Sequence, residues 1–240
     1  MELRDTVAIV TGASSGIGEA IARELSTLGV RLVLTARREE RLAALAASLP
    51  SPSVTLAAAI EAPDTPAALL GLALKSFGRA DILINNAGIF VAARIDTADL
   101  DELSQMMRVN FDAVVRGSYV LARHFKAQGH GAIINVSSVA AYISSSSVGV
   151  YSGLKHALEV FTSALRVELN GTGVRVGTVA PGTTETEIFD KLRARGAKVG
   201  ADGTPALDPA DIAAAVRFML EQPDRANVAR MLVVSASESV

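Results

Sequence analysis

The sequence predicts an α/β fold, a doubly wound parallel sheet of about seven strands with helices on both faces. Short apolar runs rich in Val and Ile alternate with longer segments in which apolar residues recur every three or four positions. The runs are almost continuously hydrophobic, as parallel strands must be when helices cover both faces of their sheet. No linker rich in Pro, Gly or Ser interrupts the alternation, so we expect residues 1–240 to form a single domain.

The runs and the segments between them define the expected elements in chain order. Helical spacing of apolar residues is clear over Ile17–Leu28 and again over Leu154–Leu169, where the helix is expected to begin at about Val150. The expected strands are Val7–Val10, Leu32–Thr35, Val54–Ala58, Ile82–Asn85, Ile133–Val136, Val174–Val179 and Met231–Val234.

The composition excludes several functional classes. Hydrophobic residues make up 50% of the chain, and 23 basic against 25 acidic residues give a net charge of -2, so neither disorder nor binding to nucleic acid or an anionic membrane is expected. Because cysteine is absent, disulfides, thiolate metal sites and thiol catalysis are excluded, and we expect no metal site. The chain has no apolar stretch of membrane-spanning length and no recognisable signal peptide, so we expect a cytoplasmic protein.

The first expected strand runs directly into a glycine-rich turn with the spacing Gly-x-x-x-Gly-x-Gly, and then into a helix. Glycines at these places allow a tight turn, close approach of the backbone to a pyrophosphate and close packing of helix on strand. The free N–H groups and partial positive charge of the helix N-terminus suit that anion. The turn by itself also fits an ordinary strand–turn–helix unit. In a Rossmann-like sheet, the expected cofactor contacts here are Gly12, Ser14, Ser15, Gly16, Ile17 and Gly18.

The end of the second expected strand indicates which dinucleotide would bind. Folds that bind NAD place a carboxylate roughly 20 residues after the glycines, where it bonds the ribose 2′-hydroxyl. Here Ala36 stands in place of the acid, and Arg37 and Arg38 follow it. Arginines bind a 2′-phosphate through charge-assisted hydrogen bonds, so the sequence favours NADP(H) over NAD(H). The two arginines are also compatible with a solvated helix face beside Glu39 and Glu40.

Tyr151 and Lys155 are four residues apart in an expected helix and therefore share one of its faces. A free tyrosine has a pKa of about 10 and is almost entirely protonated at neutral pH. A cation about 4 Å away contributes on the order of 4 kcal/mol, which can lower that pKa by up to roughly three before desolvation. We therefore expect Lys155 to bring the pKa of Tyr151 toward the value that suits a general acid–base. A lone pair of this kind is often a surface coincidence, so its surroundings decide.

Further polar and small residues follow the other expected strands. Asn85–Gly88 comes after the fourth strand, Ser138 after the fifth, and Pro181-Gly182 after the sixth, with Thr186 four residues beyond. Asn110 lies in a helical pattern ahead of the fifth strand. Ligands of open α/β sheets bind outside the carboxyl ends of the strands, so we expect these residues to surround one site.

Together, these motifs resemble the short-chain dehydrogenase/reductase family across nearly the whole chain. The resemblance implies that Tyr151 exchanges a proton with the substrate oxygen while NADP(H) exchanges a hydride with the carbon. Lys155 would hold the nicotinamide ribose and lower the pKa of the tyrosine. Ser138 would hydrogen-bond the substrate oxygen, and Asn110 would extend a proton relay through a water molecule. Ser137 is the second choice for the serine role.

The resemblance also implies contacts along the rest of the cofactor. Family members often carry an Asp after the third strand that contacts the adenine, whereas this chain has Ala59 there. Ile60 can still pack beside the adenine ring. The other implied contacts are Asn86, Ala87 and Gly88 at the adenosine ribose, and Pro181, Gly182, Thr184 and Thr186 at the nicotinamide.

The substrate is indicated only by class. Residues 183–207 would form a lid in proteins that this chain resembles, and Arg193 or Arg195 could meet a substrate carboxylate or phosphate there; a polar lid without that role fits equally well. The ending Met231–Ser235 is similar to NADP-dependent 3-hydroxy-acid (serine-type) dehydrogenases and ketone reductases. The resemblance therefore implies an NADP(H)-dependent oxidoreductase that interconverts a small ketone or 3-oxo acid with its secondary alcohol.

Two alternatives accompany this interpretation. Within the family the alternative is a 3-oxoacyl-carrier-protein reductase, and outside enzymology it is an NADP-binding sensor or scaffold on the same fold. Family members are commonly tetramers or dimers built through two long helices, which here would be about Thr97–Phe125 and Val150–Leu169. The expected partners are thus a small carbonyl or alcohol substrate and further copies of the chain in a homo-oligomer, with no nucleic acid and no membrane.

Overall fold

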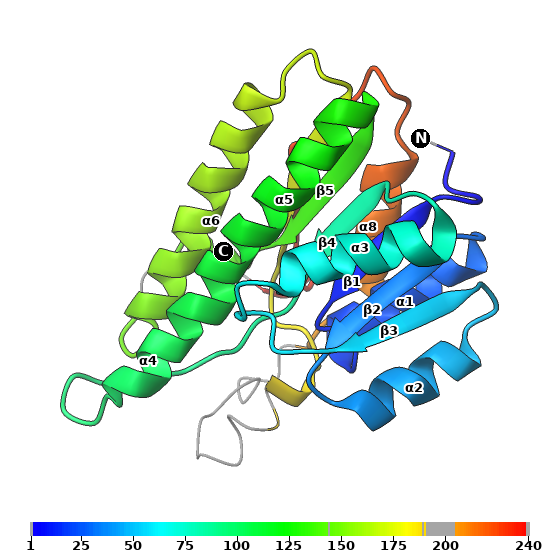
Figure 1. The fold of residues 1–240 in the computed structure, drawn as a ribbon. Coiled ribbons are helices and arrows are strands. Elements are labelled where there is room, and N and C mark those ends of the chain that lie inside the picture. The colour runs from blue at the N-terminus through cyan, green and yellow to red at the C-terminus, as the bar shows by residue number, and fades with distance from the viewer. Residues whose placement is uncertain (1, 144, 189, 191–204, 239–240) are drawn as a thin grey trace.

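The computed structural model describes residues 2–143, 145–188, 190 and 205–238. Its centre is a seven-stranded sheet in the order β3-β2-β1-β4-β5-β6-β7, and every neighbouring pair of strands is parallel (Figure 1). The seven predicted strands are confirmed, with each boundary within two residues of the prediction. The strands are β1 (Val7–Thr11), β2 (Arg31–Ala36), β3 (Ser53–Ala57), β4 (Ile82–Asn85), β5 (Gly131–Val136), β6 (Val174–Pro181) and β7 (Arg230–Val233).

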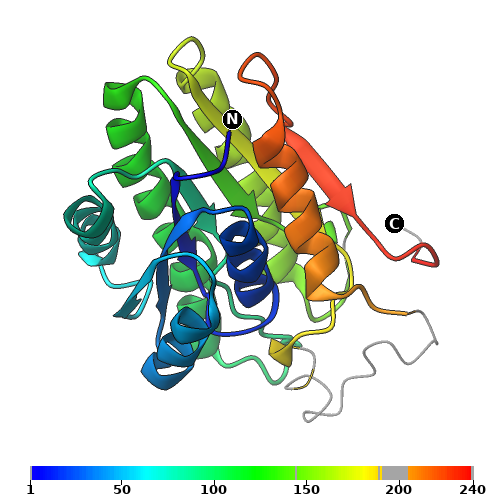
Figure 2. The same cartoon turned by 90° about the vertical axis from the view of Figure 1, so that its right-hand side faces the viewer.

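Helices cover both faces of the sheet, as the doubly wound prediction requires (Figures 1 and 2). On one face α1 (Gly16–Thr27), α2 (Glu39–Ser48) and α8 (Pro209–Glu221) form a hydrophobic core with the sheet. On the other face α3 (Thr65–Phe77), α5 (Ala113–Gln128) and α6 (Gly149–Glu168) form a second core.

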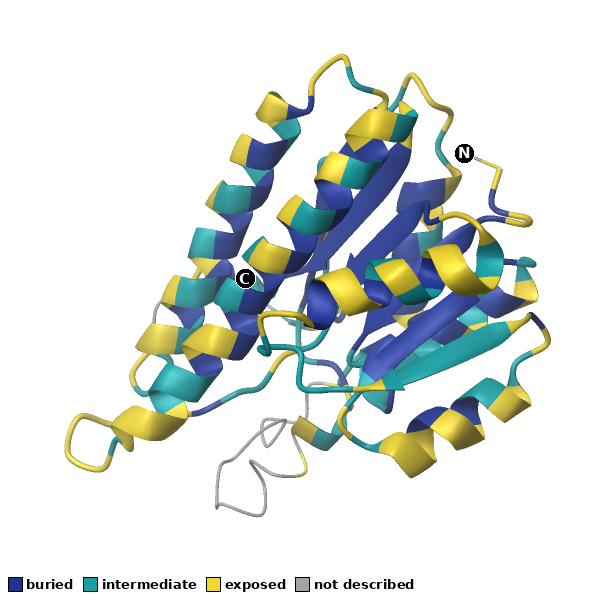
Figure 3. Ribbon diagram, in the orientation of Figure 1, coloured by how far each residue is buried: buried dark blue, intermediate teal, exposed yellow. Residues whose placement is uncertain are grey.

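Alternate residues of a strand point to opposite faces, and β1 shows the consequence of this period. Ala8 and Val10 belong to the first core, whereas Val7 and Ile9 belong to the second. All five residues of β1 are buried, which explains the unbroken apolar run in the sequence. Figure 3 shows the central strands buried between helices whose outer faces are exposed, whereas the edge strand β3 is only partly buried.

The long helix predicted over about Thr97–Phe125 differs from the structure in two respects. It begins only at α4 (Leu100–Met107), because Asp99 caps it by accepting hydrogen bonds from the N–H groups of Asp101 (2.8 Å) and Glu102 (3.2 Å). A π-helical segment, Arg108–Asp112, then separates α4 from α5. Insertions of this kind are rare within helices and frequently occur at functional sites.

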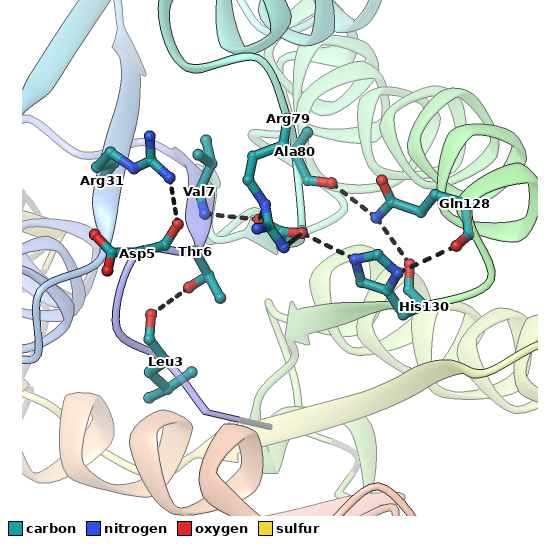
Figure 4. A network of polar contacts seen from close by, with 10 residues as sticks. Leu3, Asp5, Thr6, Val7, Arg31, Arg79, Ala80, Gln128 and His130 are labelled. Carbon is teal, nitrogen blue, oxygen red and sulfur yellow. Dashed lines mark hydrogen bonds and ion pairs between the residues drawn. The ribbon is translucent and has the colours of Figure 1, made fainter.

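The amino ends of the central strands are held together by a buried carboxylate, Asp81, which is 0% exposed. Its oxygens accept hydrogen bonds from the N–H of Val7 (2.9 Å), from two nitrogens of Arg79 (2.7 and 2.8 Å) and from the His130 side chain (3.2 Å). Val7 opens β1, and Asp81 and His130 directly precede β4 and β5 (Figure 4). Several partners thus offset the cost of burying this charge. The network lies at the edge of the sheet opposite to the ends where ligands bind in such folds.

Candidate active site

The glycine turn joins β1 to α1 as predicted. Gly12 and Gly16 have φ angles of 67° and 55°, a left-handed conformation that side chains disfavour. A Cβ on Gly18 would lie 2.4 Å from both the carbonyl oxygen of Gly12 and Nδ2 of Asn86, so helix, turn and the end of β4 are in close contact. Ser15 stands at the N-cap of α1 without a side-chain cap hydrogen bond, which leaves the first N–H groups of the helix available to an anion.

The residues predicted at the adenosine ribose lie beside this turn. The hydroxyl of Thr11 donates to the carbonyl of Ile84 (3.2 Å) and accepts from the N–H groups of Asn86 and Ala87 (both 3.0 Å). The side-chain amide of Asn86 donates to the carbonyl oxygen of Thr11 (2.9 Å). The carboxyl ends of β1 and β4 are therefore fixed to each other, and Asn86, Ala87 and the exposed Gly88 follow at that junction.

The predicted arginines differ in their surroundings. Arg37 is exposed, whereas Arg38 turns back to the glycine turn and donates to the hydroxyls of Ser14 (3.0 and 3.2 Å) and Ser15 (2.7 Å). Arg38 also forms an ion pair with Glu187 (2.7 Å), a residue of the segment after β6. The structure thus brings Arg38, but not Arg37, into contact with the turn.

Ser138, Tyr151 and Lys155 come together at the carboxyl end of β5. Ser138 caps a short 3-10 helix, where its hydroxyl accepts from the N–H of Ala140 (3.1 Å), and it is also hydrogen-bonded to Tyr151. Lys155, 6% exposed, donates to the carbonyl of Val136 (2.8 Å), and its ammonium lies 5.7 Å from the centre of the Tyr151 ring. These contacts place the acid–base candidate, the serine and the lysine in one site.

The electrostatics of this group differ from the prediction that Lys155 lowers the pKa of Tyr151. Burial raises the pKa of Tyr151, and the hydrogen bond with Ser138 is what opposes this rise. Burial lowers the pKa of Lys155 to about 8, although the charge of Glu159 acts in the other direction. The ammonium is directed to the Val136 carbonyl, and burial and the Ser138 hydrogen bond, not the charge of Lys155, shift the pKa of Tyr151. Spacing alone therefore overestimates the effect of Lys155 on that pKa.

Asn110 lies in the π-helical segment and is 1% exposed. Its side chain accepts from the N–H of Ile89 (2.8 Å) and donates to the carbonyl of the same residue (2.7 Å). The amide thereby holds the segment that follows Asn86–Gly88. Asn85, in contrast, is tied to Ser118 (3.1 Å) and Asn135 (2.8 Å) inside the fold.

The residues predicted at the nicotinamide follow β6, of which Pro181 is the last residue. The hydroxyl of Thr184 donates to the carbonyl of Gly182 (3.0 Å), and a Cβ on Gly16 would lie 3.1 Å from Thr186, so this segment reaches the glycine turn. Residues 191–204 of the expected lid, with Arg193 and Arg195, lie outside the described residues.

The residues expected at the adenine, Ala59 and Ile60, follow β3. Ile60 is half-buried and packs against the core on the α3 face, and the carbonyl of Ala59 accepts from the hydroxyl of Thr65 (2.8 Å). No carboxylate therefore stands at Ala59, and Ile60 offers an apolar surface.

Sequence reasoning missed three residues of this region. The Phe90 ring packs edge-on against Tyr151 with 4.7 Å between ring centres. The Glu238 carboxylate accepts from the N–H (3.2 Å) and hydroxyl (3.1 Å) of Thr183, next to Gly182. Glu187 binds both Arg38 and Arg41. The only sequence signal was the presence of Arg38 and Arg41 three positions apart, which place both side chains on one helical face.

Residues 6–197 match the family described as short chain dehydrogenase. An uncharacterised oxidoreductase of Staphylococcus saprophyticus is 34% identical over 243 residues, which cover 99% of each chain.

Two solved structures are similar over nearly their whole length. A closed form of serine dehydrogenase complexed with NADP+ has a TM-score of 0.90 and 27% identity, and the match covers 98% of this chain and 97% of that one. A 3-ketoacyl-(acyl-carrier-protein) reductase from Brucella melitensis complexed with NADH has a TM-score of 0.87 and 28% identity, with 98% of each chain covered.

Proposed function

Because this chain belongs to the short-chain dehydrogenase family, we propose that it is an NADP(H)-dependent oxidoreductase that interconverts a carbonyl and a secondary alcohol. The observation that carries the proposal is the contact of Tyr151 with Ser138 beside the buried Lys155. A phenol hydrogen-bonded to a hydroxyl at the carboxyl ends of the strands can give a proton to a carbonyl oxygen, or take one from an alcohol.

The residues around the glycine turn fit a phosphorylated dinucleotide. Because Gly12 and Gly18 lack side chains, the turn packs closely beside Asn86 and Ala87, and the uncapped start of α1 offers N–H groups to a pyrophosphate. Arg38, with the hydroxyls of Ser14 and Ser15, supplies the donors that a 2′-phosphate requires. Asn86–Gly88 and Ile60 would line the adenosine, and Pro181–Thr186 the nicotinamide, which supplies or accepts the hydride when bound.

The chain's own residues divide the proton chemistry. In the reducing direction, Tyr151 would donate its hydroxyl proton to the carbonyl oxygen, and in the oxidising direction the phenolate would take it back. Ser138 would hold the substrate oxygen and stabilise the charge that develops on it. Lys155 would keep the tyrosine in place from its anchor on the Val136 carbonyl, and Asn110 would fix the loop that carries Phe90 against the Tyr151 ring.

We propose a small ketone or a 3-hydroxy or 3-oxo acid as the substrate class. The similarity to a serine dehydrogenase complexed with NADP+ supports it, together with the ending Met231–Ser235. The similar 3-ketoacyl-(acyl-carrier-protein) reductase supports the alternative of an acyl-carrier-protein substrate. A homo-oligomer built through α5 and α6 is also proposed; it is supported by exposed apolar residues on these helices, among them Tyr119, Val160 and Val167.

The function can be tested by following NADPH absorbance with a panel of ketones, β-keto esters, 3-oxo acids and a 3-oxoacyl thioester. We expect turnover of one class with NADPH, weak turnover with NADH and almost none in Tyr151→Phe. Tyr119→Phe is the matched control and should keep full activity, because it removes only the hydroxyl of an exposed tyrosine of α5 and keeps the ring at the proposed interface. Binding of NADPH without turnover of any carbonyl would instead support the sensor or scaffold alternative.

A further inference from the structure

A carboxylate from the segment after β6 bridges two arginines at the start of α2. One oxygen of Glu187 lies 2.7 Å from Nη1 of Arg38, and the other oxygen pairs with Nη1 of Arg41. These partners are 149 and 146 residues away in the chain, so the contact is purely tertiary. Hydrogen bonding by Arg41, assisted by Arg38, lowers the pKa of Glu187, so this carboxylate is an anion at neutral pH.

Arg38 also connects this carboxylate to the glycine turn. Its remaining donors bind the hydroxyls of Ser14 and Ser15, which are the residues proposed above to meet the ribose phosphate of NADP(H). A guanidinium has five N–H donors in one plane, and Arg38 makes four hydrogen bonds with them, to two hydroxyls and one carboxylate. Glu187 therefore holds the donors that a 2′-phosphate would need.

The charge and the exposure of these side chains indicate how the Glu187 carboxylate and a 2′-phosphate would interact. Two guanidinium groups and one carboxylate leave one net positive charge, to which a 2′-phosphate would add up to two negative charges. The side chains of Arg38, Arg41 and Glu187 are 40%, 52% and 37% exposed, so solvent screens the ion pairs and each is easily replaced. A 2′-phosphate that binds Arg38 thus meets the Glu187 carboxylate, which has the same sign of charge and is already paired with this arginine.

We propose that Glu187 is a specificity-determining residue whose carboxylate competes with the 2′-phosphate of NADP(H) for Arg38 and Arg41. Glu187 then weakens the binding of the phosphorylated cofactor selectively and narrows the preference for NADP(H) over NAD(H). This inference rests on the proposed function, because it concerns the same cofactor site. It assigns a role to a residue that contacts neither the reacting atoms nor the proton donor.

The test is a calorimetric comparison of nucleotide binding to the wild type and Glu187→Gln. The probes are 2′-AMP and 5′-AMP, which differ only in phosphate position, followed by NADP+ and NAD+. We expect Glu187→Gln to bind 2′-AMP and NADP+ about fivefold more tightly, since two partly exposed ion pairs no longer compete. Binding of 5′-AMP and NAD+ should stay unchanged. Glu40→Gln is the matched control, because it removes an exposed carboxylate from the first turn of α2.

A second variant, Arg38→Ala, shows whether Glu187 affects 2′-AMP binding through Arg38. Arg38→Ala should weaken 2′-AMP binding, and adding Glu187→Gln to it should bring much less gain than in the wild-type background. Equal gains in both backgrounds would mean that Glu187 acts through bulk charge, and would overturn the proposal.

The remaining outcomes separate this inference from the proposed function. If Glu187→Gln weakens the binding of all four nucleotides, Glu187 helps to hold the nucleotide instead of competing with it, and the inference is wrong. If the substitution changes the binding of none of them while the wild type prefers 2′-AMP, the ion pairs have no role in nucleotide recognition, and only the inference fails. If neither protein prefers 2′-AMP and both bind NAD+, the proposed preference for NADP(H) fails as well. A preference that appears only in Glu187→Gln would confirm the competition.

Discussion

The hydroxyl of Tyr151 is under two opposing influences, burial that raises its pKa and a hydrogen bond from Ser138 that lowers it. Ser138→Ala removes the second influence, so the pKa of Tyr151 should rise further. Because alcohol oxidation needs the deprotonated phenol, the midpoint of its rising pH profile should move to higher pH. Loss of one oxyanion-type donor should also slow turnover about 100-fold. Both effects are measured from kcat/KM against pH.

Ser137→Ala is the matched control for this experiment. The hydroxyl of Ser137 is buried and makes no hydrogen bond within the described part of the chain. Its removal should leave the midpoint in place. An identical midpoint in Ser138→Ala and the wild type would contradict the role of Ser138 in setting the pKa of Tyr151.

Lys155 should make stability depend on pH in the alkaline range. Burial lowers its pKa to about 8, whereas the unfolded chain has the ordinary value of about 10.4. Between these values the unfolded state binds more protons, so the free energy of unfolding rises with pH, and below the folded pKa the penalty of a buried charge is fully present. Relative to Lys155→Met, the wild type should therefore gain about 3 kcal/mol from neutral pH to about pH 10.5. Urea unfolding of both proteins at several pH values measures the difference; a constant difference would mean an ordinary pKa.

Individual residues of the candidate site were predictable where a local sequence pattern indicated their position. Tyr151 and Lys155 stand one helical turn apart, and Ser138 lies two residues after the end of β5, so spacing and the position after a strand predicted that they share one site. Glu187 was not predictable, because its partners are more than 140 residues away and only the fold brings them near. The pKa of Tyr151 was wrongly predicted for a related reason, since spacing does not show which carbonyl Lys155 contacts.

The glycine turn and α1 pack so closely that one added methyl group should lower the stability of the protein. Gly18→Ala would place a Cβ 2.4 Å from the Gly12 carbonyl, so we expect a loss of stability of about 2 kcal/mol and weaker binding of NADPH. Gly153→Ala, in α6 with nothing near its Cβ position, should instead stabilise the protein by about 0.5–1 kcal/mol. Thermal unfolding and NADPH titration of both variants measure these effects. Equal melting temperatures would contradict the close packing at Gly18.

The helices show where local patterns cease to determine an element. The sequence pattern located α1 and α6 to within a few residues, because apolar spacing reports the face that each helix buries. The π-helical segment around Asn110 has no such signature. It coincides with two hydrogen bonds between Asn110 and Ile89, which lies in a different part of the chain.

The molecule separates the groups that stabilise the sheet from those proposed to act on ligands. Asp81→Asn would remove the buried charge that joins β1, β4 and β5 at their amino ends. We expect a loss of about 3 kcal/mol in the free energy of unfolding, with kcat and KM unchanged well below the melting temperature. Asp112→Asn breaks an exposed ion pair with Arg116 and should leave stability nearly unchanged. A large change of KM in Asp81→Asn would show that the two ends are coupled.

The parallel direction of the strands followed from the alternation of strand and helix, since parallel strands require crossovers and place their carboxyl ends at one edge. That edge gathers Gly12, Asn86, Ser138 and Pro181, each of which ends a strand or follows one within two residues. The sequence could not predict contacts between segments outside the strands, such as Glu238 with Thr183 or Phe90 with Tyr151. Those contacts depend on loop conformations, which no periodic pattern specifies.

The Asp81 network also bears on laboratory evolution. Its residues belong to the starts of β1, β4 and β5, and none of them lies in the segments that line the proposed site. A combinatorial library in Thr183–Ile188 and Phe90 therefore leaves this buried charged network of the sheet intact. Most members of such a library should fold, so that screening would sample changes in selectivity without first having to repair the scaffold.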